Sequence, residues 1–235
     1  MADIERMKKY ASTQPITWDP SEGACTLCDG NGWKTYWVDV STHPNGGKGV
    51  YSFQAECPLC IRRLARQRKE AANVGNYHMA DFDWTAYPGA DGIEKKREAV
   101  EKFIRNYPVW EKRGKGLYIF GGTSGAGKTF LAECIAGELL ENWNDGTTRM
   151  VNEGELIEMS RRRPENGTDP LSSVLSCRLL ILDDVGQKKK QREYADDILF
   201  RLIDTRYRAH RVTLYTSNYP LDHLTSKRII ERINA

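Results

Sequence analysis

Eight consecutive residues, Gly122–Thr129, carry the clearest chemical pattern in the chain. They fit G-x-x-x-x-G-K-[ST], the pattern of a loop that surrounds phosphate groups. The glycines allow backbone N–H groups to close around an anionic phosphate chain, and a following helix adds the partial positive charge of its N-terminus. We expect Lys128 to reach the β- and γ-phosphates of ATP and the Thr129 hydroxyl to bind Mg²⁺. The predicted ATP contacts are Gly122, Thr123, Ser124, Gly125, Ala126, Gly127, Lys128, Thr129 and Phe130.

The segments on either side of this loop have the sequence patterns of a strand before it and a helix after it. Residues 117–120 form a short apolar run typical of a strand, and residues 130–140 have apolar side chains at helical spacing. Strand, glycine loop and helix in this order are the context of a phosphate-binding loop. We therefore favour a nucleotide site over a glycine turn without function.

Two carboxylates end the most apolar segment of the chain, Leu179–Leu182. A continuous apolar run is typical of a central parallel strand that is buried on both faces. Ligands of open α/β sheets bind beyond the carboxyl ends of such strands. We expect Asp183 to hold Mg²⁺, directly or through water, and Asp184 to orient and deprotonate the attacking water.

A polar residue, Asn218, follows the next predicted strand, residues 212–216. At that strand end it would lie between the two carboxylates and the γ-phosphate, where it could hold the attacking water. The alternative is an asparagine that only starts a turn before Pro220. The order of the strands favours the catalytic interpretation.

Four cysteines form two C-x₂-C pairs, Cys25 with Cys28 and Cys57 with Cys60. The residues between the pairs read as a β-hairpin, with β-prone runs at 33–40 and 50–55 around a turn-rich segment at 42–47. A hairpin returns the second pair to the first, and four thiolates suit tetrahedral Zn²⁺. We interpret His43 as a loop residue, because four cysteines already complete the site. Cys134 and Cys177 are predicted to be small core residues.

Three basic segments allow two interpretations each. The helix predicted at 61–69 either contacts nucleic-acid phosphates or an acidic partner, or is a solvated helix surface. The run Arg161–Arg163 either faces a strand of DNA or is a solvated helix end. Arg228 and Arg232 lie one helical turn apart and are either surface residues or an arginine finger for a neighbouring subunit.

Length and composition predict one α/β core with a small additional unit. The chain has 235 residues, of which 40% are hydrophobic, and its net charge of +3 says little about nucleic acid. No apolar run approaches the ~18 residues of a membrane helix, and no signal peptide is visible, so we expect a cytoplasmic protein without membrane contact. The predicted divisions are a tail at 1–20, a zinc unit with its basic helix at 21–70, a linker at 71–92 and the ATPase at 93–235. Within the linker, Asp81–Trp84 either lies near the adenine base or simply packs on the core.

From Tyr77 to its end the chain resembles the AAA+ helicase loaders of the DnaC/DnaI type and their transposition relatives of the IstB type. The zinc unit is similar to that of DnaI-like and phage-encoded loaders. IstB-type proteins generally lack such a unit. The segments that carry the resemblance, as an ordered series, are 116–132, 179–186, 203–208, 213–218 and 228–233.

The resemblance implies an α/β fold, a P-loop AAA+ domain with a five-stranded parallel sheet between helices, preceded by a small zinc-binding hairpin domain. It implies ATP-regulated placement of the hexameric, DnaB-type replicative helicase on single-stranded DNA. The N-terminal unit would bind the helicase, and the ATPase domains would self-assemble around the DNA in the ATP state, with Arg232 or Arg228 completing the neighbour's site. Many relatives have Asp-Glu where this chain has Asp183-Asp184, so turnover is expected to be slow. Only four core strands are predicted, where relatives continue with a final strand.

Two other functions fit parts of the same pattern. One is an IstB-like transposition helper ATPase that assembles on duplex DNA. The other is a zinc-finger DNA-binding regulator whose nucleotide site acts only as a conformational switch. Preference for duplex DNA would distinguish the first from a loader, and the absence of hydrolysis would distinguish the second.

Overall fold

The chain folds as two compact units, Met1–Gln67 and Arg68–Ala235, which are described separately. The structure is a computed structural model, and it describes residues 25, 28, 33–39, 50–86, 92–122, 125–142, 147–164, 167–186, 192–224 and 226–234. The expectations for the tail, for the turn at 42–47 with His43, and for Thr123 and Ser124 lie outside the described residues.

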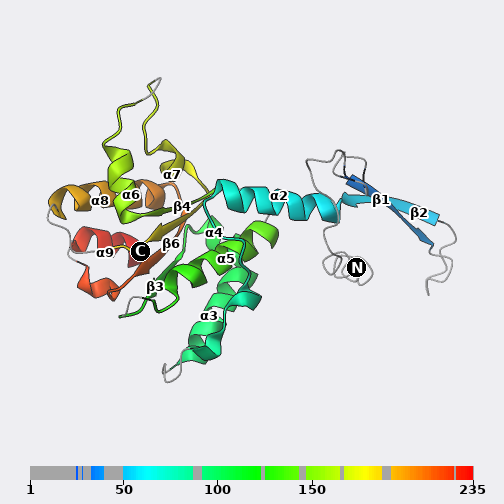
Figure 1. Ribbon diagram of the computed structural model, residues 1–235, viewed down its shortest axis with the longest axis horizontal. Helices are drawn as coiled ribbons and strands as arrows, with labels where there is room; N and C mark the ends of the chain where they lie inside the picture. The colour runs from blue at the N-terminus through cyan, green and yellow to red at the C-terminus, as the bar shows by residue number, and fades with distance from the viewer. Residues whose placement is uncertain are drawn as a thin grey trace. The chain divides into compact units, whose positions relative to one another are not determined.

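The first unit contains the predicted hairpin. Strands β1, Trp33–Asp39, and β2, Val50–Glu56, pair antiparallel with Trp33 opposite Glu56 (Figure 1). Helix α2, Pro58–Ala71, follows β2 directly, and it begins at a proline, a residue that suits the first turn because its missing N–H would have no partner there. The helix is predominantly polar and basic, as the sequence predicts.

The second unit contains a sheet of four parallel strands in the order β3-β6-β5-β4. The sheet resembles the predicted one, with four strands in the described part of the chain against five implied by the family resemblance. The apolar runs of β5 and β6 lie at the centre, where both faces are buried. The strands are β3 Leu117–Phe120, β4 Thr148–Asn152, β5 Leu179–Asp183 and β6 Val212–Ser217.

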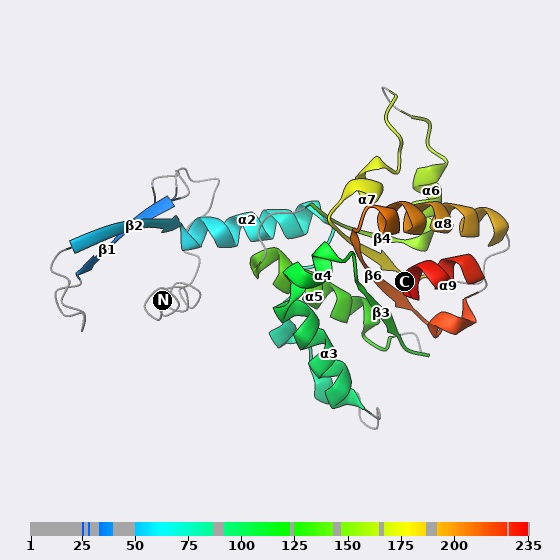
Figure 2. The same cartoon turned by 180° about the vertical axis from the view of Figure 1, so that it is seen from behind.

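Within the described residues, helices cover both faces of this sheet (Figures 1 and 2). Successive residues of β5 point to opposite faces, so Leu179 and Ile181 enter one core and Leu180 and Leu182 the other. The first face carries α3 Ile93–Arg105, α4 Tyr107–Lys112 and α5 Lys128–Asn142. The second carries α6 Glu153–Ser160, α7 Ser172–Ser176, α8 Arg192–Arg208 and α9 Lys227–Asn234. Short 3₁₀ turns are η2 Met79–Asp81, η3 Trp84–Ala86 and η4 Leu221–His223.

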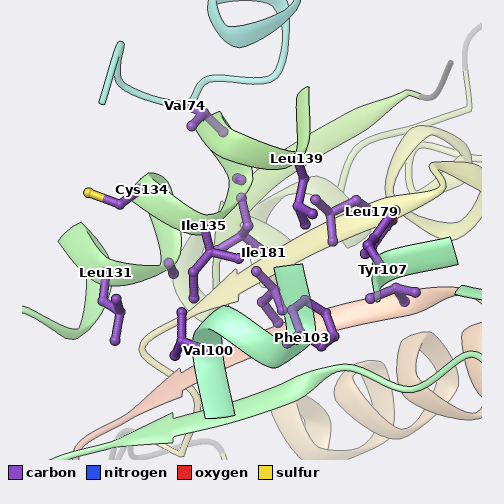
Figure 3. Packing of buried hydrophobic residues seen from close by; sticks show 14 of the residues in the cluster. Val74, Val100, Phe103, Tyr107, Leu131, Cys134, Ile135, Leu139, Leu179 and Ile181 are labelled. Atoms are coloured by element: carbon purple, nitrogen blue, oxygen red, sulfur yellow. The ribbon is translucent and has the colours of Figure 1, made fainter. Parts of the chain in front are cut away.

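The first core holds α5 against the sheet. Ile135 and Leu139 of α5 meet Phe103 of α3 and Ile181 of β5 (Figure 3). Cys134 is fully buried on α5, and Cys177 is buried in the second core, so both predicted core cysteines are confirmed. The helix that begins in the nucleotide loop is thus fixed along its length.

The segment after α2 also packs on α5. Ala72, Val74 and Phe82 are buried in the first core. A Cβ atom added at Gly137 would lie 2.0 Å from the Tyr77 carbonyl oxygen, so this close approach requires glycine. Nearer the end of α5, the buried Lys69 ammonium pairs with Glu141 at 2.9 Å.

Local signals set the helix boundaries with one exception. A capping box begins α6: Glu155 N donates to Asn152 Oδ1 at 2.9 Å, and Asn152 N donates to Glu155 Oε2 at 3.1 Å. Helix α3 ends at Arg105, so Pro108 is not the residue that ends it. Pro108 lies in the first turn of α4, where its missing N–H costs no hydrogen bond. Within the described residues, no helix is long and apolar enough to cross a membrane.

Candidate nucleotide site and metal centre

The glycine loop connects the end of β3 to the start of α5. The helix begins at Lys128, so its N-terminus lies next to the predicted phosphate position. Gly125 and Gly127 have φ angles of 80° and 69°, in the left-handed region that favours glycine. The Lys128 side chain is largely buried at this position. Loop and helix together provide the backbone N–H groups that a triphosphate needs.

The two predicted Mg²⁺ ligands are in direct contact. Thr129 Oγ1 donates a hydrogen bond to Asp183 Oδ1 at 2.8 Å. Adjacent oxygen ligands of octahedral Mg²⁺, each about 2.0–2.1 Å from the ion, lie about 2.9 Å apart. The two oxygens therefore already have the separation that one Mg²⁺ requires, and they fit this ion.

Thr216, which no sequence pattern singles out, holds the Asp183 carboxylate and the backbone that follows it. Its hydroxyl donates to Asp183 Oδ1 and accepts from Asp184 N at 2.9 Å, while its carbonyl accepts from Val185 N at 2.8 Å. Its position as the fifth residue of β6, beside β5, is the signal that could have identified it.

Glu153 fixes the other side of the turn Asp184–Gly186. This first residue of α6 is 1% exposed, and its Oε2 accepts a hydrogen bond from Gly186 N at 2.6 Å. Ser217 Oγ donates to the Val185 carbonyl at 2.6 Å. The turn that carries Asp184 is therefore held by β6 on one side and by α6 on the other.

Asn218 lies beside the start of the nucleotide loop. β6 pairs with β3, with Phe120 opposite Ser217, and Gly121 N donates to the Ser217 carbonyl at 3.2 Å. The Asn218 Oδ1 atom is buried without a hydrogen-bond partner among the described residues. An unpaired buried polar atom costs about 1–3 kcal/mol, so this amide is suited to a ligand or water.

A cavity of about 330 Å³ adjoins the loop at Ala126–Lys128. Phe82 and Trp84 contribute to its apolar lining, and their rings lie 4.8 Å apart. The Phe82 ring also stacks on Phe130, at 5.9 Å, so Phe130 contacts this lining. Both interpretations of Asp81–Trp84 fit, because these rings pack on the core and also border the loop. The cavity has the size and apolar lining of a small-ligand pocket.

The two arginines of α9 contact α8. Arg232 Nε donates to Asp204 Oδ1 at 2.7 Å, and Arg228 pairs with Asp197. The Arg228 guanidinium also lies 4.5 Å from the centre of the Phe200 ring.

The basic run that follows α6 is exposed. Arg161, Arg162 and Arg163 all lie on the surface, and the Arg161 guanidinium is 5.5 Å from the centre of the Tyr194 ring. None of the hydrogen bonds and ring contacts given above for the described residues connects these arginines to the glycine loop or to Asp183 and Asp184.

The four predicted zinc ligands come together at the base of the hairpin. Their sulfur atoms lie within 4.8 Å of one another, with 3.8 Å between those of Cys25 and Cys57 and 3.4 Å between those of Cys28 and Cys60. The pairing of Trp33 with Glu56 explains this, because one cysteine pair precedes β1 and the other follows β2. Sulfurs around tetrahedral Zn²⁺ lie about 3.8 Å apart. Burial raises the pKa of the Cys57 and Cys60 thiols, and a bound cation would offset this, so the cluster fits zinc.

Residues 59–228 match a family described as IstB-like ATP binding protein. The chain is 27% identical over 192 residues to the replicative helicase loader DnaI of Bacillus subtilis (strain 168), which covers 77% of this chain and 60% of that protein. It thus spans about 60% of the length of this curated relative.

Solved structures have the same fold. A crystal structure of DnaI superposes with a TM-score of 0.54 and 27% identity, covering 74% of this chain and 89% of that one. A crystal structure of the DnaC helicase loader gives a TM-score of 0.52 at 22% identity, covering 65% and 89%, and shows that the fold is shared.

Proposed function

This chain belongs to the family of IstB-like ATP binding proteins, and from that membership we propose that it is an ATPase that loads the replicative DNA helicase onto single-stranded DNA. The observation that carries the ATPase role is the 2.8 Å contact between Thr129 and Asp183 beside the glycine loop. The helicase role is supported by the 27% identity with the helicase loader DnaI.

In this proposal the loop residues Gly122–Thr129 bind the triphosphate, and Lys128 contacts its β- and γ-phosphates. Thr129 and Asp183 hold Mg²⁺, which neutralises phosphate charge when bound. Asp184 takes the proton of the attacking water, and Asn218 orients that water. Because Asp is one methylene shorter than Glu, hydrolysis is slow, as suits a switch. The cavity lined by Phe82 and Trp84 receives the adenine base.

The zinc unit, residues 21–70, binds the hexameric helicase, and zinc fixes the base of its hairpin. The exposed run Arg161–Arg163 contacts single-stranded DNA through phosphates. In the ATP state the chain self-assembles, and Arg232 or Arg228 completes the neighbour's nucleotide site. For that, either arginine must exchange its carboxylate partner on α8 for a phosphate.

A transposition helper ATPase is the second candidate, because the matching family is described as IstB-like. The cluster of four cysteines favours the loader, since the transposition relatives generally lack such a unit. The third candidate, a zinc-finger regulator with a nucleotide switch, predicts ATP binding without hydrolysis.

The deciding experiment compares the full chain with Lys128→Ala and with the exposed control Lys102→Ala. Each is mixed with ATP, Mg²⁺, single-stranded DNA and the hexameric replicative helicase of the same cell. We expect the wild type and the control to bind ATP and to deposit the helicase on the DNA. Lys128→Ala should bind ATP at least about tenfold more weakly, with unchanged zinc content.

Normal ATP affinity in Lys128→Ala would contradict the nucleotide site. A wild type that binds ATP but not the helicase, and prefers duplex DNA, would favour the transposition helper. If the wild type binds ATP and DNA but does not hydrolyse ATP even when the helicase is present, the zinc-finger regulator is favoured.

A further inference from the structure

Among the residues that the structure describes, a second cavity of about 130 Å³ is lined by four cations and by no aspartate or glutamate. Arg113, Lys115, Arg211 and Arg232 contribute to its wall. The first three lie just before β3 and β6, which begin at Leu117 and Val212 and run parallel. The nucleotide loop follows the opposite end of β3. The two sites therefore lie at opposite ends of the sheet.

Two glycines bring these cations together. Gly114 has a φ angle of 64°, and a Cβ atom there would lie 2.7 Å from the Cα atom of His210. A Cβ atom at Gly116 would lie 1.8 Å from the Thr213 carbonyl oxygen. Because neither position has room for a side chain, the two backbone segments approach closely. The neighbouring residues Arg113, Lys115 and Arg211 are thereby held around one cavity.

The positive charge of this cluster is not balanced within the described part of the chain. Arg113, Lys115 and Arg211 have no ion-pair partner there, whereas Arg232 shares Asp204 with Arg208 at 2.7 and 2.8 Å. Behind them, Arg206 is 1% exposed and donates to the carbonyls of its neighbours. Burial lowers the pKa of Arg206, and the charge of Arg211 lowers it further. Cations that line one cavity without a carboxylate partner favour binding of an anion.

An exposed aromatic ring completes the surface. Tyr207 lines the cavity and is 41% exposed, and the Arg232 guanidinium lies 5.1 Å from the centre of its ring. Cations that follow a phosphate backbone, next to a ring on which a base can stack, are the usual components of a site for single strands.

We propose that Arg113, Lys115 and Arg211 form a second phosphate-binding site, which is occupied by a backbone phosphate of a single-stranded polynucleotide whose base stacks on Tyr207. The chemistry recognised is a phosphate group. The choice of a polynucleotide over a free phosphate or nucleotide rests on the proposed function.

The test uses a full-length double variant, Arg113→Gln with Arg211→Gln. Its control is Lys102→Gln with Arg105→Gln, which removes the same charge from exposed positions of α3. Binding of a labelled oligo-dT strand is followed by fluorescence anisotropy at several salt concentrations, with an ATP analogue present. Loss of this one phosphate contact should reduce the magnitude of the slope of log K against log salt by about 0.7 and weaken binding at low salt. The control should bind like the wild type.

The ring is tested separately. Tyr207→Ala should weaken oligo-dT binding without changing the salt slope, and Tyr207→Phe should bind like the wild type, because stacking needs the ring and not the hydroxyl. A Phe variant as weak as the Ala variant would remove the stacking part of the proposal.

A second arm distinguishes the source of the phosphate. Inorganic phosphate is titrated by calorimetry in a Lys128→Ala background, which disables the nucleotide loop, and oligo-dT is added as a competitor. Phosphate binding that the double variant loses and oligo-dT displaces supports the polynucleotide. The same loss without displacement assigns the site to a free phosphate or nucleotide.

If the double variant and its control bind oligo-dT and inorganic phosphate equally well, the proposed phosphate site is contradicted. ATP binding and helicase capture by the wild type are measured alongside, so failure of the proposed function would appear there and not in this comparison.

Discussion

At the scale of single residues, Asp184 reaches the nucleotide site in a backbone conformation that aspartate seldom adopts. Its φ angle is 56°, in the left-handed region, which costs an L-residue roughly 1–2 kcal/mol. The hydrogen bonds of Thr216 and Glu153 to the turn Asp184–Gly186 offset this cost. Strain held by surrounding contacts is common where a carboxylate must be aimed.

Glu153 is therefore predicted to act as a positioning residue for hydrolysis. Glu153→Ala removes the acceptor for Gly186 N, so the turn loosens, and kcat should fall about 10–100-fold while KM for ATP stays unchanged. Glu153→Gln keeps an acceptor oxygen and should retain most of the activity. Steady-state kinetics of the two variants make the comparison. Equal losses in both, or a rise in KM alone, would contradict the positioning role.

The motif residues and the positioning residues differ in how far sequence can reveal them. Lys128 and Thr129 follow from a contiguous pattern, and Asp183 follows from the apolar strand before it. Glu153 and Gly186 are 33 residues apart, and the sequence around Glu153 reads only as the start of a helix. Their contact depends on the order in which β4 and β5 lie in the sheet, which no local pattern contains.

At the scale of elements, α8 and α9 show how tertiary contacts change local expectations. Along α8, Asp197 with Arg201 and Asp204 with Arg208 have the i,i+4 spacing of helical ion pairs. Asp204 does pair with Arg208, at 2.8 Å, but Asp197 pairs with Arg228 of α9 and Arg201 with Asp169. An exposed pair within a helix contributes only about 0.3–0.5 kcal/mol, so partners from other elements compete easily. Element types were predictable from periodicity, whereas these pairings were not.

The α8–α9 contact should give stability a specific pH dependence. The pKa of Asp204 lies below its usual value, chiefly because Arg232 donates a hydrogen bond to the carboxylate. Because the pKa of Asp204 is lower in the folded state, the group stabilises the fold at pH values above its unfolded-state pKa of about 3.9. This stabilisation is lost as the pH falls through the folded-state pKa. Asp204→Asn should therefore be less stable than the wild type at neutral pH, with a difference that shrinks in acid.

Urea unfolding at a series of pH values measures this difference. Glu158→Gln, which changes another exposed carboxyl group on α6, is the control and should follow the wild type. A difference between Asp204→Asn and the wild type that stayed constant down to the most acidic pH would show that the ion pair is not its source.

At the scale of the whole molecule, the zinc cluster and the nucleotide site belong to different compact units. The hairpin of the first unit has two strands, and an isolated two-stranded hairpin is at best marginally stable in water. Zinc bound at the cysteine cluster would therefore supply much of the folding free energy of this unit. The second unit has two cores of its own, one on each face of its sheet.

Removal of zinc should separate the two functions. Treatment with a zinc-selective chelator in excess Mg²⁺, or the substitution Cys57→Ser, is expected to unfold the hairpin and abolish helicase capture, while the Kd for ATP changes less than about twofold. Metal analysis measures the zinc content, circular dichroism the folding of the hairpin, and ATP titration the Kd for ATP. Cys134→Ser is the control that leaves zinc bound. A large loss of ATP affinity on chelation would contradict the independence of the units.

The two buried core cysteines have a practical consequence for such work. Cys134 is fully buried, and burial raises the pKa of its thiol to about 12, while Cys177 is also buried with a raised pKa. Both stay protonated and shielded near neutral pH, and so react slowly with thiol reagents. Of the six cysteines, the four of the cluster are then the ones that a colorimetric thiol reagent counts after metal release. The difference between the thiols counted before and after metal release would therefore report how much zinc the chain holds.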